Sequence, residues 1–222
     1  MEVRILPHGG KQEENMQDTK ESLITNPFFA ALPPDISERL CDSCQFRIYA
    51  RNQSISVRYW QLLTAVLEEG AMIFGSYDAE GRFITSGLAG RGTLISPGTL
   101  IDVWHEAGSQ RDILCLFDCK VAVFDTALVQ TLFQDCIPFI HTVYGNIRQH
   151  YSVEKQQFLE AVGGRDSYAA VRYILQWCQA YRIPPLTHEQ IALLCNRSRP
   201  TVTETLHRLL RQEPELFQTV SP

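Results

Sequence analysis

The chain has 222 residues, of which 45% are hydrophobic, and its formal net charge at pH 7 is −5. This length holds one large or two modest domains, with enough apolar material for a core. No uncharged apolar run approaches the roughly 18 residues of a membrane span, and the polar start lacks the apolar stretch of a signal peptide. These features exclude membrane and small secreted classes, so we expect a cytoplasmic protein with no membrane partner. We expect its seven cysteines to be mostly reduced thiols.

The charge divides unevenly along the chain. Residues 165–222 hold seven Arg, no Lys and five Asp or Glu, a net +2, which leaves 13 bases and 20 acids, a net −7, in residues 1–164. The sequence thus indicates a weakly basic C-terminal module on an acidic body.

The first part of the chain reads as a polar arm, two short helices and a β-rich domain. We expect residues 1–20 to form a flexible arm and the short helices to cover Glu21–Phe29 and Asp35–Cys44. From Gln45 to Asp125, short alternating runs are separated by turn residues, which is typical of an antiparallel sandwich or jelly roll. The predicted strands are Phe46–Ala50, Ser54–Val57, Leu62–Leu67, Gly70–Tyr77, Phe83–Ala89, Gly92–Ile95, Ile113–Phe117 and Lys120–Phe124.

A helical region follows from Thr126 to about Val162, with a long helix starting near Pro138. One side of this helix shows the three- and four-residue spacing of a paired helix, which favours a homodimer; the alternative is a helix that lies on the β-roll. The spaced residues are Ile140, Val143, Ile147, His150 or Tyr151, and Glu154.

After a predicted hinge at Gly163-Gly164, residues 164–222 read as three helices. Asp166 or Ser167 caps the first, which runs through Ala180. Thr187 and Gln190 form a capping box for the second, and Asn196 suits a sharp turn with left-handed backbone. Ser198 caps the third, where Pro200 is tolerated in the first turn.

The last helix has two faces. Its apolar stripe consists of Val202, Leu206, Leu209 and Leu210. The opposite face carries Arg199, Thr201, Thr203, Glu204, His207, Arg208 and Arg211. Two helices joined by a tight turn, with polar and cationic groups on the second, are typical of a DNA-reading helix-turn-helix, although an ordinary αα-hairpin has the same outline.

The run Ile191-Ala-x-Leu-x-Asn196-Arg-Ser198-Arg199-x-Thr201-Val202 resembles the helix-turn-helix pattern of the CRP/FNR transcription regulators. The segment from Asn26 to Leu40 and the hairpin from Leu67 to Gly81 resemble the opening and a β-hairpin of that family's sensor domain. The resemblance implies an α+β fold: an N-terminal antiparallel β-roll (jelly roll) sensor at 21–125, a long dimerisation helix at 126–163, and a C-terminal winged-helix-type helix-turn-helix at 164–222. The wing is expected to be short or missing.

The resemblance also assigns DNA-binding residues, namely Ser198, Arg199, Thr201, Thr203, Glu204 and Arg208. Arg199 takes the place of the family's base-reading arginine, and Ser198 and Thr201 would hold phosphates. Pro200 and Glu204 replace a base-contacting glutamate and a second arginine of the family, so we expect an operator unlike the usual family box. Glutamate accepts from cytosine N4.

For the effector pocket, the resemblance points to Arg111, Thr93, Thr99 and Asp112. Arg111 stands where nucleotide-binding relatives hold the cyclic phosphate. Thr93, Pro97 or Thr99 stands where a glutamate would hold the ribose. Asp112 places a carboxylate beside the expected anion, so we predict weak or no cyclic-nucleotide binding and an unknown small-molecule effector.

Cysteines and histidines are the other candidate sensing groups in the sequence. Cys41 and Cys44 form a CxxC that could act as a redox switch, although packing of small apolar thiols is the simpler interpretation. Because no cysteine precedes Cys41, an iron–sulfur cluster of the FNR type is not expected. Haem would need His105 or His150 as a ligand, which scattered histidines do not favour, and no metal site is predicted.

The sequence therefore predicts a homodimeric regulator that binds double-stranded DNA at a near-palindromic operator, and RNA polymerase as well if it is an activator. The alternative is a ligand-binding or protein-interaction module that has lost DNA binding. An enzyme is not expected, because the sequence has no nucleophile elbow or phosphate loop.

Overall fold

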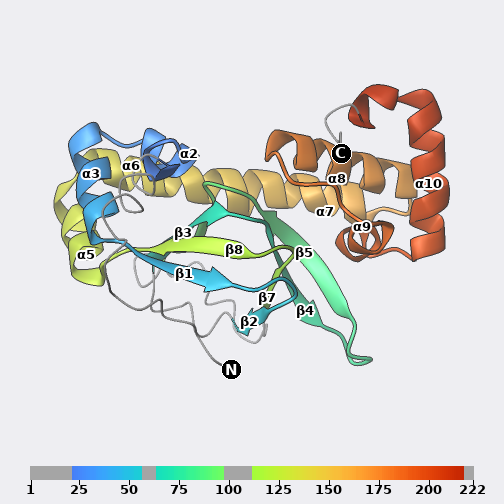
Figure 1. Cartoon of the computed structure of the whole chain (residues 1–222), viewed down its shortest axis with the longest axis horizontal. Helices are drawn as coiled ribbons and strands as arrows, with labels where there is room; N and C mark the ends of the chain where they lie inside the picture. Colours follow the sequence, from blue (N-terminus) through green and yellow to red (C-terminus); the bar gives the residue numbers. More distant parts are fainter. Residues whose placement is uncertain (1–21, 57–63, 98–111, 218–222) are drawn as a thin grey trace, which may run out of the picture.

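The computed structural model describes residues 22–56, 64–97 and 112–217. A β-roll lies along a long helix, and a helical C-terminal unit sits at one end of that helix (Figure 1). The predicted arm at residues 1–20 lies outside the described residues.

The β-roll consists of two four-stranded antiparallel sheets, with strand orders β1-β8-β3-β6 and β2-β7-β4-β5. The strands are β1 Gln45–Tyr49, β2 Ser54–Ser56, β3 Thr64–Glu69, β4 Met72–Tyr77, β5 Phe83–Ala89, β6 Leu94–Pro97, β7 Asp112–Cys115 and β8 Cys119–Val123. All eight predicted strands are confirmed. Strand β5 is at the edge of its sheet, with β4 as its strand neighbour.

Alternate side chains of these strands fill the space between the two sheets. Leu67, Met72, Ile113 and Val121 are at most 1% exposed and belong to one core cluster. This alternation is the period of two that the sequence shows for half-buried strands.

Helices cover one end of the roll. They are α2 Pro27–Ala30, α3 Pro34–Ser43, α5 Thr126–Asp135 and α6 Ile137–Ile147. The rings of Phe28 and Phe29 lie 5.8 and 5.6 Å from that of Phe124, at the end of β8. The predicted helix over Glu21–Phe29 is interrupted, because Asn26 caps α2 by accepting from the N–H of Phe28.

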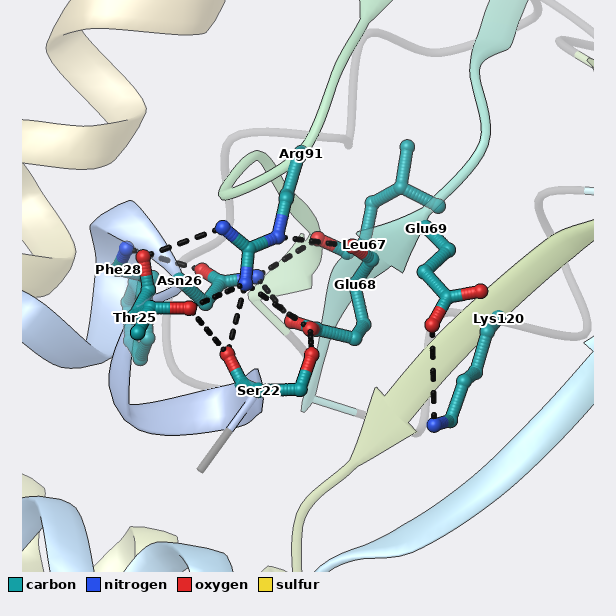
Figure 2. Close-up of polar contacts among 9 residues, drawn as sticks. All are labelled: Ser22, Thr25, Asn26, Phe28, Leu67, Glu68, Glu69, Arg91 and Lys120. Atoms are coloured by element: carbon teal, nitrogen blue, oxygen red, sulfur yellow. Dashed lines mark hydrogen bonds and ion pairs between the residues drawn. The ribbon is translucent and has the colours of Figure 1, made fainter. Parts of the chain in front are cut away.

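A buried polar cluster ties this helical end to the sheet (Figure 2). The carboxylate of Glu68, on β3, is fully buried. It accepts from the Ser22 hydroxyl at 2.6 Å, the Asn26 amide at 2.6 Å and the Arg91 guanidinium at 3.1 Å. Arg91 also donates to the carbonyls of Ser22, Thr25 and Glu68. Because the charge is paired and its oxygens accept hydrogen bonds, burial of this carboxylate is tolerated.

The long helix continues from α6 through the π-helix η3, Arg148–Glu154, into α7, Lys155–Gly163. Val143 and Ile147, from the spaced set predicted to form a dimer seam, pack in the chain's own core at 0% and 8% exposure. Tyr151 and Glu154 also contact the chain's own residues. The predicted seam is therefore wrong: its spacing arises because the helix lies on the roll.

The C-terminal unit contains α8 Ser167–Ala180, α9 His188–Cys195, α10 Arg199–Gln212 and the short 3-10 helix η4 Pro214–Phe217. The caps predicted at Asp166, Thr187 and Ser198 are confirmed, as is the Thr187–Gln190 capping box. Asn196 adopts the left-handed conformation with φ 52°. Leu210 was predicted to face inward but is 53% exposed, and Thr205 takes an inward position instead. No strand follows α10 as far as residue 217.

No helix in the described ranges is both long and apolar enough to cross a membrane.

We predict that Arg91→Ala lowers the free energy of unfolding by about 3 kcal/mol, because it leaves the buried Glu68 carboxylate without its cation. Chemical denaturation measures this loss. Arg82→Ala is the control, since Arg82 also pairs with carboxylates but its side chain is 72% exposed. Equal destabilisation by the two variants would contradict the prediction.

Candidate nucleic-acid interface and sensor site

Helix α10 has the geometry of a recognition helix. On its inner face Val202 and Leu209 are fully buried, whereas Arg199, Glu204 and His207 are exposed. The Ser198 hydroxyl lies 2.8 Å from that of Thr201 and accepts from the Thr201 N–H, which fixes the first turn. The exposed N-terminal half of α10 can therefore approach a DNA groove with its backbone already capped.

Two further predicted DNA-binding residues have partners on other helices of the chain. The Thr203 hydroxyl lies 2.9 Å from Nδ1 of His188, at the start of α9. Arg208 places its guanidinium 4.5 Å from the ring centre of Tyr168, on α8. Arg208 is nine residues after Arg199, so the two arginines point in roughly opposite directions around the helix, about half a turn apart.

The sequence assignment left out His207 and Arg211, which are exposed on α10 together with Glu204. Positions 204, 207 and 211 follow the spacing of one helix face. That spacing was visible in the sequence. The contact of His188 with Thr203 was not, because it joins two helices.

The turn between α9 and α10 is attached to the β-roll. The side-chain amide of Asn196 bonds both the N–H and the carbonyl of Thr85, on β5, at 2.9 Å each. The Thr85 hydroxyl donates to the carbonyl of Leu193 at 3.0 Å. Arg197 donates to the carbonyls of Val162 and Gly164 at the end of α7. Neither attachment was predicted, because each joins residues more than 30 positions apart.

The predicted effector pocket is described only in part, since Arg111 and Thr99 lie outside the described residues. Thr93 is fully buried, and its hydroxyl has no hydrogen-bond partner in the described ranges. Asp112 begins β7 opposite Ser56 and Gly75 and is half-buried. The structure does not bring Thr93 and Asp112 together in any described contact.

Tyr151 occupies the space between the long helix and the roll. Its hydroxyl donates to the carbonyls of Leu94 and Ile95 at 2.6 and 3.0 Å, and its ring lies 5.8 Å from that of Phe74. Burial raises the pKa of Tyr151 well above its usual range. A neighbouring cavity of about 20 Å³, lined by Phe74, Ser86, Gly87, Leu88, His150, Tyr151 and Lys155, has room for about one water molecule.

A second polar junction joins the π-helix to the end of α8. The carboxylate of Glu154 lies 3.1 Å from Nδ1 of His150 and accepts from the Tyr181 hydroxyl at 2.8 Å. Burial works to raise the pKa of Glu154, but hydrogen bonds from His150, Tyr181 and Gln149 and the charge of His150 hold it below its usual value. Burial and the Glu154 carboxylate raise the pKa of Tyr181 strongly. Irregular π-turns are frequent at functional sites.

The CxxC cysteines lie at the end of α3. Cys41 is buried, and the Cys44 thiol lies 3.4 Å from its carbonyl. Burial raises the pKa of Cys44 to about 12. A reactive cysteine needs a populated thiolate, so this environment favours packing over the redox role.

The metal and haem hypotheses find no set of ligands among the described residues. The described residues contain no group of three or more His, Cys, Asp or Glu side chains that could hold a metal ion. His105 lies outside the described residues. His150 is engaged with Glu154 and Tyr181.

We predict that Glu154→Gln lowers the free energy of unfolding at pH 7 by about 1.5 to 3 kcal/mol, the usual contribution of hydrogen bonds to a charged group. Because the folded-state pKa of Glu154 is depressed, its contribution is present above its usual pKa of 4.5 and is lost as the pH falls below that value. Thermal unfolding from pH 7 to pH 3 should therefore show the two proteins converging. Glu160→Gln is the control, because Glu160 is exposed on the same helix. A difference that stays constant with pH would contradict the prediction.

No protein-family profile and no curated protein sequence matches this chain. Solved structures do match. A protein from Eubacterium rectale assigned to the CRP/FNR family of transcriptional regulators is 14% identical, with a TM-score of 0.58 over 84% of this chain and 87% of that one. A CRP-family transcriptional regulator from Thermus thermophilus is 18% identical, with a TM-score of 0.56 over 74% and 84%.

The c-di-GMP-responsive global regulator CLP from Xanthomonas campestris is 12% identical, with a TM-score of 0.59 over 81% of this chain and 93% of that one. At these identities the similarity concerns the fold. The chain has the fold of the CRP/FNR transcriptional regulators.

Proposed function

We propose that this chain is a DNA-binding transcription regulator of the CRP/FNR type. The observation that carries the proposal is helix α10, whose buried Val202 and Leu209 anchor it while Arg199, Glu204 and His207 remain exposed. The fold supports the same conclusion, because the similar structures include transcriptional regulators. An activator of this type would also contact RNA polymerase.

The polar side chains of α10 imply an operator sequence unlike the usual one of the family. Arg199 can bond O6 and N7 of guanine together, and Glu204 can accept from N4 of cytosine. Pro200 offers neither a donor nor an acceptor from its side chain, so it adds no polar base contact. Thr203 reaches the groove with a hydroxyl already held by His188.

We propose a homodimer that pairs through the outer face of the long helix. Outward apolar side chains lie on both sides of η3: Ile137 at 67%, Tyr144 at 51%, Val153 at 37% and Leu159 at 46% exposure. Tyr144 is seven residues after Ile137, so regular α-helical spacing of about 100° per residue puts these two side chains on the same side of α6.

Two-fold pairing of this kind places two recognition helices on one duplex. The half-sites of such operators lie about 34 Å apart. A shift in dimer geometry would change how well the two recognition helices fit these half-sites. The effector remains unknown. We propose that it is not a cyclic nucleotide, because the sequence resemblance aligns Asp112 with a position beside the expected phosphate, where a carboxylate would repel it.

We predict that Arg199→Ala weakens binding to the selected operator by about 1 to 3 kcal/mol, or about 5- to 150-fold. The operator is obtained by selecting bound sequences from random DNA, and affinities are measured by electrophoretic shift. Arg39→Ala, on the exposed side of α3, removes the same charge far from α10 and serves as the control. Binding of no sequence by the wild-type protein would favour a module that has lost DNA binding.

We also predict that Tyr144→Glu raises the dimer dissociation constant by about thirtyfold or more, the effect of losing a contact of about 2 kcal/mol at an interface centre. Sedimentation over a concentration series measures the change. Ile48→Glu on β1 is a matched control, since Ile48 is also 51% exposed. If Tyr144→Glu still sediments like the wild type, the outer helix face is not the pairing surface.

A further inference from the structure

We propose that Asn196 is a positioning residue that fixes the helix-turn-helix to strand β5, so that the recognition helix takes its orientation from the sensor domain. The inference rests on the proposed function and deepens it, because it names the contact through which the sensor would set DNA affinity.

The contact has the form of strand pairing. Asn196 accepts from the N–H of Thr85 and donates to its carbonyl, each at 2.9 Å. Two neighbouring strands exchange the same pair of bonds between opposed residues. Strand β5 is an edge strand, whose outer backbone groups otherwise need water or another chain. Thr85 is only 2% exposed, so the side chain of Asn196 satisfies groups that the docked helices shield from water.

The turn itself does not require asparagine. Its φ of 52° is adopted by glycine at lower cost. Glycine would complete the turn and leave the N–H and carbonyl of Thr85 unpaired under α9. The amide of Asn196 therefore adds a contact with the roll to the turn.

The next residue extends the attachment to the long helix. Arg197 donates to the carbonyl of Val162 at 3.0 Å and to that of Gly164. These carbonyls lie at the end of α7, where the chain leaves the long helix for α8. The helix-turn-helix is thus held at its turn by both the sheet and the helix.

Strand β5 also borders the small cavity between the roll and the long helix. Ser86 and Leu88, just after Thr85, line the cavity beside His150, Tyr151 and Lys155 of the long helix. A ligand that moved β5 against this helix would move the partner of Asn196 at the same time. Coupling between sites needs such a physically continuous element.

The docked arrangement should favour DNA binding. A recognition helix already held in one orientation loses less freedom when it binds, which improves affinity without a new contact. Loss of the Asn196 amide should therefore weaken operator binding even though Asn196 lies in the turn before the recognition helix.

The test uses Asn196→Gly in the full-length protein, which keeps the left-handed turn and removes the amide. Hydrogen exchange should show the Thr85 amide at least about tenfold less protected, since its acceptor is lost. Affinity for the selected operator should fall about three- to tenfold, with an unchanged salt dependence because the phosphate contacts remain. Thr85→Val, which removes only the hydroxyl bond to Leu193, should give a smaller loss in the same direction.

Asn52→Gly is the matched control. Asn52 also has a left-handed backbone, with φ 63°, in the exposed turn between β1 and β2. It should change neither Thr85 protection nor operator affinity.

Three results would overturn the proposal. Unchanged Thr85 protection in Asn196→Gly would mean that the contact is not formed in solution. Unchanged operator affinity in Asn196→Gly would mean that the contact has only a structural role. Tighter operator binding would mean that the contact opposes DNA binding. Absence of DNA binding by the wild-type protein would instead refute the proposed function, while the exchange measurement would still show whether Asn196 holds β5.

Discussion

The structure depends on a hydrophobic core that the β-roll and the C-terminal helices share. Ile73 and Leu88 of the roll belong to the same buried cluster as Ile174 of α8, Leu194 of α9 and Leu209 of α10. The three C-terminal helices bury their apolar faces against each other and against α7 and the sheet, so they do not form a freely tethered unit. Because interiors are close-packed, a change in the roll or in the long helix is transmitted to α10 as a movement of packed elements.

Most of the fold could be predicted from the sequence because its signals are local. Alternation located the eight strands, and the capping residues Asp166, Thr187 and Ser198 gave the starts of the three C-terminal helices. Asn196 was expected in a left-handed turn for its backbone preference alone. Each of these features depends on residues within a few positions of one another.

The errors came where one pattern has two physical causes. The spacing of Val143, Ile147 and Tyr151 fits a helix paired with a second copy and also a helix lying on its own roll, and the structure shows the second. The sequence did not single out the exposed Ile137, Tyr144, Val153 and Leu159, because their exposure becomes apparent only once the fold shows which side of the long helix lies on the roll. The attachment of Asn196 to Thr85, separated by 111 positions, has no local signal. Such contacts can be inferred only after the fold brings the two segments together.

Two of the polar junctions that hold the helix-turn-helix unit contribute differently to its placement. At the end of α8, Tyr181 bonds the depressed-pKa carboxylate of Glu154 on the long helix, so this junction responds to charge. At the turn, Asn196 bonds neutral backbone groups of β5, so this junction responds to the position of the strand. A hydrogen bond to a neutral backbone group is worth only about 1 kcal/mol. In the proposed regulator, this pair of bonds would be strong enough to bias the orientation of α10 and weak enough for an effector to reverse that bias.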